Sequence, residues 1–166
     1  MILGMSLSTF TLVHVVLSLV GICSGLLVLY GLLLGKRFDG ATGIFLLTTA
    51  LTSLTGFLFP FEHLKPSYVF GVISLVALAV AIPARYVLHM AGGWRRTYVI
   101  SAVLALYLNV FVLVAQIFMK VPAAHALAPT QTEPPFLITE VVVLAIFIVV
   151  GIVAVKNFRP DSLKAS

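Results

Sequence analysis

Five long apolar segments constrain this chain more than any other feature of its sequence. They cover about residues 10–34, 41–61, 68–90, 98–119 and 136–155. An apolar helix needs about 20 residues to cross a hydrocarbon core about 30 Å thick, because each residue rises only about 1.5 Å. Each segment is long enough for one crossing, so the sequence predicts five transmembrane helices.

The segments are predicted to be helices because lipid offers no hydrogen-bond partners to the backbone. They are also too long and too uniformly apolar to be strands of a membrane barrel. The composition agrees: 61% of the residues are hydrophobic and 9% are charged, whereas about a quarter are charged in soluble domains. We therefore expect an all-α membrane protein, a five-helix bundle that forms one membrane domain over residues 1–166.

Lysine and arginine residues are distributed unevenly between the two predicted sides. If the N-terminus lies outside, the cytoplasmic side holds eight of the ten: Lys36, Arg37, Arg85, Arg95, Arg96, Lys156, Arg159 and Lys164. Only Lys65 and Lys120 then lie outside. Because short cytoplasmic loops carry an excess of lysine and arginine, the sequence predicts an outside N-terminus and a cytoplasmic C-terminus. The net charge of +5 then indicates contact with the lipid bilayer and not with nucleic acid.

Several polar side chains gather near the predicted outer face. They are His14, Gln116 and Glu140 within the spans, and Glu62, His63 and His125 in the outer loops. A carboxylate at the depth of Glu140 is costly unless it is protonated, paired or hydrated. His14, at a similar depth, is a candidate partner, and the pair could hold a proton, a quinone head group or part of a metal site. Alternatively, Glu140 lies at the interface and reaches water.

The histidines raise the question of a metal or haem cofactor, which the sequence leaves open. A haem between helices usually needs two axial side chains at matching depth, and His14 is the only histidine well inside a span on the outer side. No H-x-x-x-H or H-x-x-E-H spacing is present, so no zinc motif is predicted. Haem, quinone and metal all remain open as cofactors.

Helix packing is indicated by small and polar residues inside the spans. Ser18, Gly21 and Gly25 share one face of the first span with His14, and the two glycines form a GxxxG motif. We expect this face to pack within the monomer, with a dimer contact as the alternative. Asn109 lies near the midplane of the fourth span, so it should face protein or trapped water.

Two further features concern the ends of the spans. Arg85, Arg95 and Arg96 are predicted to contact lipid phosphates on the cytoplasmic side, because long basic side chains reach toward head groups. The outer connection at 120–135 contains four prolines, and we expect extended or turn backbone there.

Two stretches of the sequence carry a resemblance. They are LYLNVFVLVAQ at residues 106–116 and VPAAHALAPTQTEPPF at residues 121–136. With these stretches the chain resembles a family of small uncharacterised multi-span bacterial inner-membrane proteins. The resemblance implies a location in the bacterial cytoplasmic membrane. It implies no activity, cofactor or catalytic residue.

The functional prediction depends mainly on what is missing from the sequence. There is no nucleophile and base set, no nucleotide-binding loop and no defined metal motif. We therefore expect a non-enzymatic subunit, scaffold or assembly partner, in contact with another membrane protein or with copies of itself. One alternative is a redox or proton-handling protein that binds a quinone, haem or metal near the outer face. A second alternative is a small oligomeric transporter.

Overall fold

The computed structural model describes residues 2–60 and 66–159, and within these residues the chain is all-helical. Four of the described helices are long and apolar enough to cross a membrane. They are α1 (Leu7–Leu33), α3 (Pro66–Tyr86), α4 (Trp94–Lys120) and α6 (Pro134–Asn157). The prediction of a helical membrane protein is therefore confirmed.

The second predicted span corresponds to α2 (Asp39–Gly56), which is not among those four helices. It is the shortest of the long helices, with 18 residues, and seven of them are serine, threonine or aspartate. It begins before the predicted residue 41 and ends before the predicted residue 61. At about 1.5 Å per residue, its length is about 27 Å.

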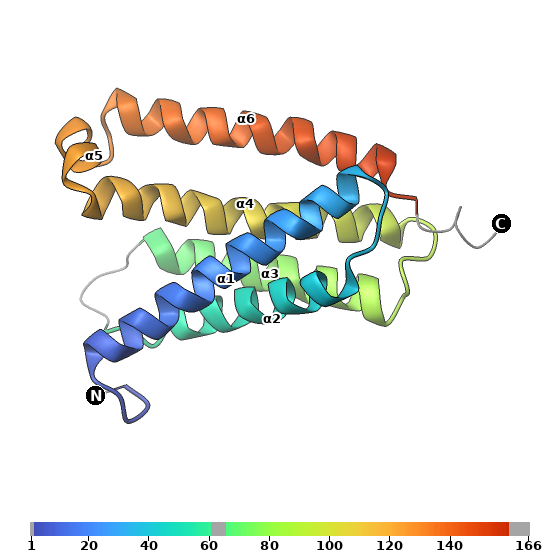
Figure 1. Cartoon of the computed structure of the whole chain (residues 1–166), viewed down its shortest axis with the longest axis horizontal. Helices are drawn as coiled ribbons and strands as arrows, with labels where there is room; N and C mark the ends of the chain where they lie inside the picture. The colour runs from blue at the N-terminus through green and yellow to red at the C-terminus, as the bar shows by residue number, and fades with distance from the viewer. Residues whose placement is uncertain (1, 61–65, 160–166) are drawn as a thin grey trace.

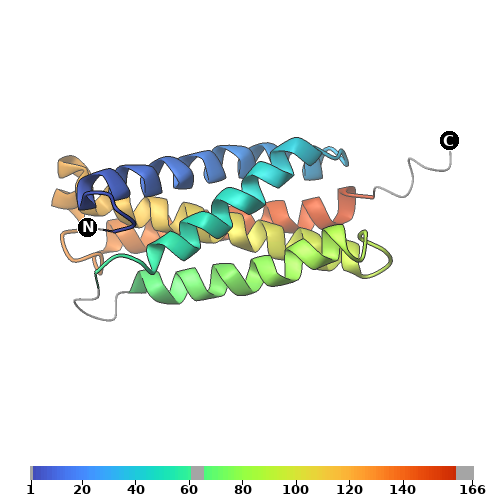
Figure 2. The same cartoon turned by 90° about the horizontal axis from the view of Figure 1, so that it is seen from below.

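The long helices lie side by side, and successive ones run in opposite directions (Figure 1). α4 lies in the middle and contacts α1, α3 and α6, while α2 packs against α1 and α3. Figure 2 shows α2 crossing obliquely between α1 and α3. The helices thus form one bundle with two ends, which differ in the charges they carry.

We call one of them the basic end, because its described residues include Lys36, Arg37, Arg96, Lys156 and Arg159. It contains the α1–α2 and α3–α4 connections and the end of α6 (Figure 1). The opposite end contains the start of α1 and the short helix α5 (Pro122–Leu127), and we call it the α5 end.

Local sequence signals explain where α1 begins and ends. The Ser6 side chain accepts a hydrogen bond from the Thr9 amide at 3.2 Å, as an N-cap should. At the other end, the Lys36 amide donates to the Gly31 carbonyl and the Gly35 amide to the Leu32 carbonyl. This is a Schellman motif, and it requires the left-handed backbone that Gly35 adopts at φ +68°.

Two predicted boundaries differ from the structure. The third span was expected to continue to Met90, but α3 ends at Tyr86, because His89 and Met90 adopt positive φ values of 47° and 57° and turn the chain. The loop at 120–135 was expected to lack helix, but it contains α5. Pro122 lies in the first turn of α5, where its fixed φ suits a helix start and its missing N–H is not needed.

Candidate functional site

Of the polar residues predicted near the outer face, those that the structure describes do not form one cluster. His14 lies on α1, half-buried, and its Nδ1 is 2.8 Å from the Thr55 hydroxyl on α2. Its ring also meets the edge of Phe59, with the ring centroids 5.2 Å apart. His14 therefore faces α2, whereas its expected partner Glu140 lies on α6.

Glu140 is the most unusual of these residues. α6 buries only three of its 24 residues, and they are Phe136, Glu140 and Ala154. Glu140 is 7% exposed, and both carboxyl oxygens are buried with no hydrogen-bond partner. Tyr107, on the neighbouring helix α4, is within electrostatic range of it. The helix thus turns its one buried acidic group into the bundle.

A small apolar cluster covers Glu140 from the α5 end. Phe136, one turn before Glu140, meets Phe118 edge-on at 5.5 Å between ring centroids. Ala128, which follows α5, completes this cluster and is fully buried. Because residues one turn apart share a helix face, Phe136 lies on the same face of α6 as Glu140, toward the α5 end. We call this cluster, with α5, the cap.

Two side-chain hydrogen bonds hold the cap on the end of α4. The Gln131 Nε2 donates to the Ala115 carbonyl at 2.6 Å. The ring Nδ1 of His125, on α5, lies 3.3 Å from the Phe118 carbonyl. The predicted site residue His125 therefore fastens the cap, and the imidazole is otherwise exposed.

The structure describes one of the three remaining predicted site residues. Gln116 is exposed on α4, and Glu62 and His63 lie outside the described residues. Over residues 2–60 and 66–159, no group of three or more His, Cys, Asp or Glu side chains is placed to hold a metal ion.

The predicted packing residues lie at contacts between helices near the middle of the bundle. The Asn109 amide on α4 donates to the Thr49 hydroxyl on α2 at 3.0 Å. Gly21 of α1 lies beside both, and a Cβ added there would be 3.1 Å from the Thr48 hydroxyl. A Cβ on Gly25 would be 2.6 Å from Leu106. Both glycines of the GxxxG motif thus face helices of the same chain.

The hydroxyl of Ser18 has a different partner. It donates to the His14 carbonyl of its own helix at 2.9 Å. The hydroxyl of Ser18 is therefore satisfied within α1.

Arg85, which was predicted to contact lipid phosphate, lies inside the protein beside an acidic residue. Its side chain is 3% exposed and forms an ion pair with Asp39 at the start of α2. The guanidinium also lies over the Tyr98 ring, 5.1 Å from its centroid. A buried guanidinium needs a counter-ion within the protein, and Asp39 supplies it.

Arg95 also has protein partners. Its guanidinium donates to the Val155 carbonyl at 2.8 Å and to the Phe158 carbonyl. These carbonyls lie at the end of α6, where backbone acceptors lack partners within the helix and a cation is favourable. Arg95 thus ties the start of α4 to the end of α6. Arg96, the third arginine predicted to contact lipid phosphate, is exposed and so remains available for that contact.

Asp39 and Tyr107 were absent from the sequence-based candidates. Asp39 had a usable signal, because Arg85 inside a span requires an acidic partner and Asp39 lies among the basic residues of the same side. Tyr107 had no such signal in the sequence, because its nearness to Glu140 depends on how α4 and α6 align.

Comparison with known proteins adds no assignment. No family model, no curated protein and no solved structure matches the chain.

Proposed function

We propose that the protein crosses a bacterial cytoplasmic membrane five times, with its N-terminus outside and the basic end in the cytoplasm. The direction of α2 supports this count, because α2 returns the chain from the basic end to the α5 end (Figure 1). Of the described lysine and arginine residues, Lys120 is the only one near the α5 end. This distribution agrees with the positive-inside rule. The α5 cap then faces the outside.

Within this topology, we propose that the protein handles protons, and that Glu140 is the group that takes up and releases them. The observation that supports the proposal is the burial of both carboxyl oxygens without a partner. An isolated carboxylate in an apolar environment is so costly that the group becomes neutral instead. Glu140 is therefore a neutral carboxylic acid in this conformation, which is the loaded state of a proton-binding site.

The surroundings of Glu140 suit a proton that arrives from the outer face. The carboxyl lies six residues into α6, which is about 9 Å along the helix from its start. On that side the cap consists of the six-residue helix α5 and a small apolar cluster. Opening the cap admits water, and the Tyr107 hydroxyl offers a hydrogen bond to the carboxylate once the proton has left.

Infrared spectroscopy of the purified protein in lipid tests this proposal directly. Subtracting the spectrum of Glu140→Gln from that of the wild type at neutral pH should leave the carbonyl band of one protonated carboxylic acid. Raising the pH should convert this band to carboxylate and release one proton. Glu133→Gln is the matched control, because Glu133 lies at the start of the same helix but is accessible to water.

Two outcomes contradict the proposal. If the difference spectrum shows a carboxylate at neutral pH, Glu140 is ionised and has a partner. If the acid band persists at every pH at which the protein stays folded, the carboxyl is structural and does not exchange protons.

A quinone version of this function follows from the same chemistry. A neutral carboxyl donates one hydrogen bond, and a quinone carbonyl accepts one. Glu140→Gln would retain a donor but lose the proton, so quinone reduction coupled to proton transfer should fall while binding persists. If the variant keeps both quinone binding and the coupled quinone reduction, the result contradicts the quinone function.

The exposure of α6 favours a second candidate function, as a subunit or assembly partner. Most residues of α6 are exposed on the outside of the bundle, where they would contact lipid or another protein. The single cysteine, Cys23, can be replaced by serine, and cysteines can then be placed on exposed positions such as Ile138 and Val149. Cross-links to a distinct membrane protein in native membranes support this function, and reaction with lipid-soluble reagents alone contradicts it.

A further inference from the structure

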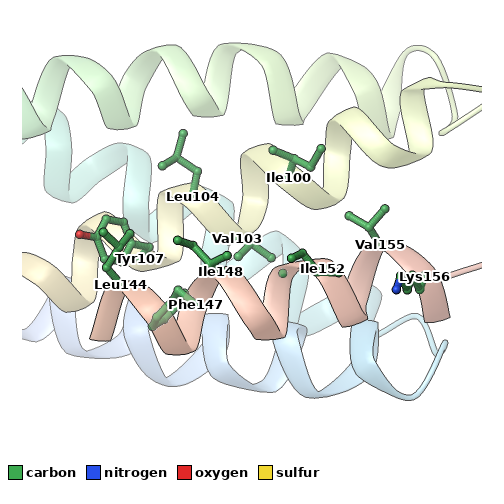
Figure 3. Close-up of a pocket in the computed structure, with 11 residues that line it drawn as sticks. Ile100, Val103, Leu104, Tyr107, Leu144, Phe147, Ile148, Ile152, Val155 and Lys156 are labelled. Carbon is green, nitrogen blue, oxygen red and sulfur yellow. The ribbon is translucent and has the colours of Figure 1, made fainter. Parts of the chain in front are cut away.

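A groove runs along the outside of the bundle between α4 and α6. It has a volume of about 420 Å³, and its lining is almost entirely apolar. Figure 3 shows its side chains in a row along the two helices, with Tyr107 at one end and Lys156 at the other. Glu140 is not among the lining residues and lies one turn before Leu144, beyond the Tyr107 end of the groove.

The floor of the groove follows from a small residue on α6. Gly151 faces Val103 of α4, and a Cβ added to Gly151 would be 3.4 Å from the Val103 side chain. The helices therefore approach closely here, while larger side chains such as Ile100, Leu104 and Ile148 form the walls. Because the helices are close at Gly151 and larger side chains lie on both sides of it, the surface between α4 and α6 forms a long, shallow channel that is open to the membrane.

The dimensions of the groove match one leaflet of a bilayer. Its lining on α6 extends from Leu144 to Lys156, and twelve residues of helix span about 18 Å. Half of a hydrocarbon core about 30 Å thick is about 15 Å. An acyl chain that begins at the basic end of the bundle therefore reaches Tyr107 near the middle of the membrane.

The charge of the groove is confined to one end. Lys156 is exposed there, and among the described residues no ion pair includes its ammonium group. Arg96 and the other basic residues of this end add to the positive potential. An occupant with an apolar chain and an anionic head group would complement both parts of the groove.

We propose that this groove binds an anionic phospholipid of the leaflet at the basic end, with one acyl chain along α4 and α6 and its phosphate on Lys156. A single basic residue near the surface contributes about 1 kcal/mol toward an anionic head group, which is about a fivefold preference. The lipid would cover the exposed flank of the α4–α6 contact. A zwitterionic lipid would fill the same groove without that preference.

The experiment measures lipid association with the reconstituted full chain. Vesicles of phosphatidylcholine and phosphatidylglycerol at three to one contain either lipid with a spin label near the chain end. The motionally restricted fraction reports how much labelled lipid contacts the protein. The wild type should restrict phosphatidylglycerol about five times more strongly than phosphatidylcholine.

Three variants separate the parts of the site. Lys156→Gln should remove the preference but leave the restricted phosphatidylcholine unchanged. Ile148→Trp should fill the groove and lower the restricted fraction of both lipids, and it should fold because Ile148 is 53% exposed on the lipid side. Lys120→Gln, at the opposite end of α4, is the control and should change neither.

The proposal is overturned if Lys156→Gln keeps the wild-type preference or if Ile148→Trp keeps the wild-type restricted fraction. A second copy of the chain in the groove would also overturn it. That arrangement is detected by a disulfide-linked dimer of Ile148→Cys in a Cys23→Ser background, formed in the same vesicles.

Discussion

Three polar residues inside this bundle have a side-chain partner on another helix, whereas the buried Glu140 carboxyl has no hydrogen-bond partner. Asn109 bonds Thr49, His14 bonds Thr55, and Arg85 pairs with Asp39. Interhelical hydrogen bonds such as those of Asn109 and His14 stabilise a membrane protein by only about 0.6 kcal/mol on average. The ion pair is different, because removing one partner leaves a buried charge. It should therefore dominate the stability of the basic end.

Asp39→Asn tests the weight of this ion pair. The variant should lose about 3 kcal/mol of unfolding free energy, because the Arg85 side chain is 3% exposed and would keep an unpaired charge. Arg37→Gln removes only the exposed pair with Asp39 at 3.4 Å and should cost less than about 1 kcal/mol. The measurement is unfolding by sodium dodecyl sulfate in mixed micelles.

Replacing both partners distinguishes the ion pair from a general effect of the substitution. Asp39→Asn combined with Arg85→Met removes the charge together with its need for a partner, so stability should return toward that of the wild type. A double variant as unstable as the single one would show that Asp39 acts in another way.

Glu133 supplies a pH-dependent prediction at the start of α6. Its carboxylate accepts hydrogen bonds from the amides of Thr130 and Thr132 at 3.1–3.3 Å and from the Thr130 hydroxyl at 2.8 Å. Desolvation raises the pKa of this carboxyl, but these bonds together outweigh it and hold the pKa below its usual 4.5. The loop is therefore stabilised above pH 4.5, and the stabilisation is lost as the pH falls through the lowered pKa.

Nuclear magnetic resonance of the protein in micelles follows this titration. The amide signals of Thr130 and Thr132 should shift together in acid, with a midpoint below 4.5. They should not shift in this range in Glu133→Gln. A wild-type midpoint at or above 4.5 would contradict the hydrogen-bonded geometry.

Some of the residue-level features could be predicted from the sequence and others could not. The position of Glu140 within an apolar segment was enough to predict that an ionised carboxylate there is energetically costly, because that cost depends on the local surroundings. Its partners could not be predicted, because they depend on the rotation of α6 against α4. The inward position of Arg85 was not predicted for the same reason. A basic residue near a helix end can contact either lipid or protein, and Arg85 contacts protein because α2 packs so that Asp39 lies beside it.

At the scale of elements, the glycines of α1 allow the closest helix contacts in the core. Gly25 lies against Leu106 of α4 and Phe45 of α2, so α1 packs into the angle between these helices. The extent of the apolar runs was predictable because bilayer thickness sets helix length. The end of α3 and the presence of α5 could not be predicted in this way. They depend on local backbone geometry, at the turn around His89 and at the helix start at Pro122.

Gly25→Ala tests this contact. The new Cβ would lie 2.6 Å from Leu106 and 2.9 Å from Phe45, so both side chains must shift, and the variant should lose about 1–3 kcal/mol of unfolding free energy. Gly43→Ala is the matched control, because nothing lies within 4 Å of its added Cβ. It should be neutral or slightly stabilising, since alanine favours helix more than glycine does. Equal losses in both variants would show that α1 does not pack through Gly25.

For the whole molecule, the number of crossings depends on α2. Its hydroxyls do not prevent it from lying in lipid, because several bond their own backbone, as Thr42 does to Phe38 and Thr48 to Ile44. Thr49 is fully buried and accepts from Asn109. The helix therefore exposes fewer unsatisfied polar groups than its composition indicates. If α2 crosses, the two termini lie on opposite sides, and if it does not, they lie on the same side.

Reporter fusions after residues 37, 60 and 159 distinguish these topologies. With five crossings and an outside N-terminus, alkaline phosphatase should be active only after residue 60, and a green fluorescent protein should fluoresce only after residues 37 and 159. Equal reporter behaviour after residues 37 and 60 means that α2 stays on one side, and the opposite pattern at all three means that the chain is inverted. The five-crossing outcome is expected because the basic residues at the α1–α2 connection, Lys36 and Arg37, resist translocation. It would place the α5 cap, and with it the proton route to Glu140, on the outer face.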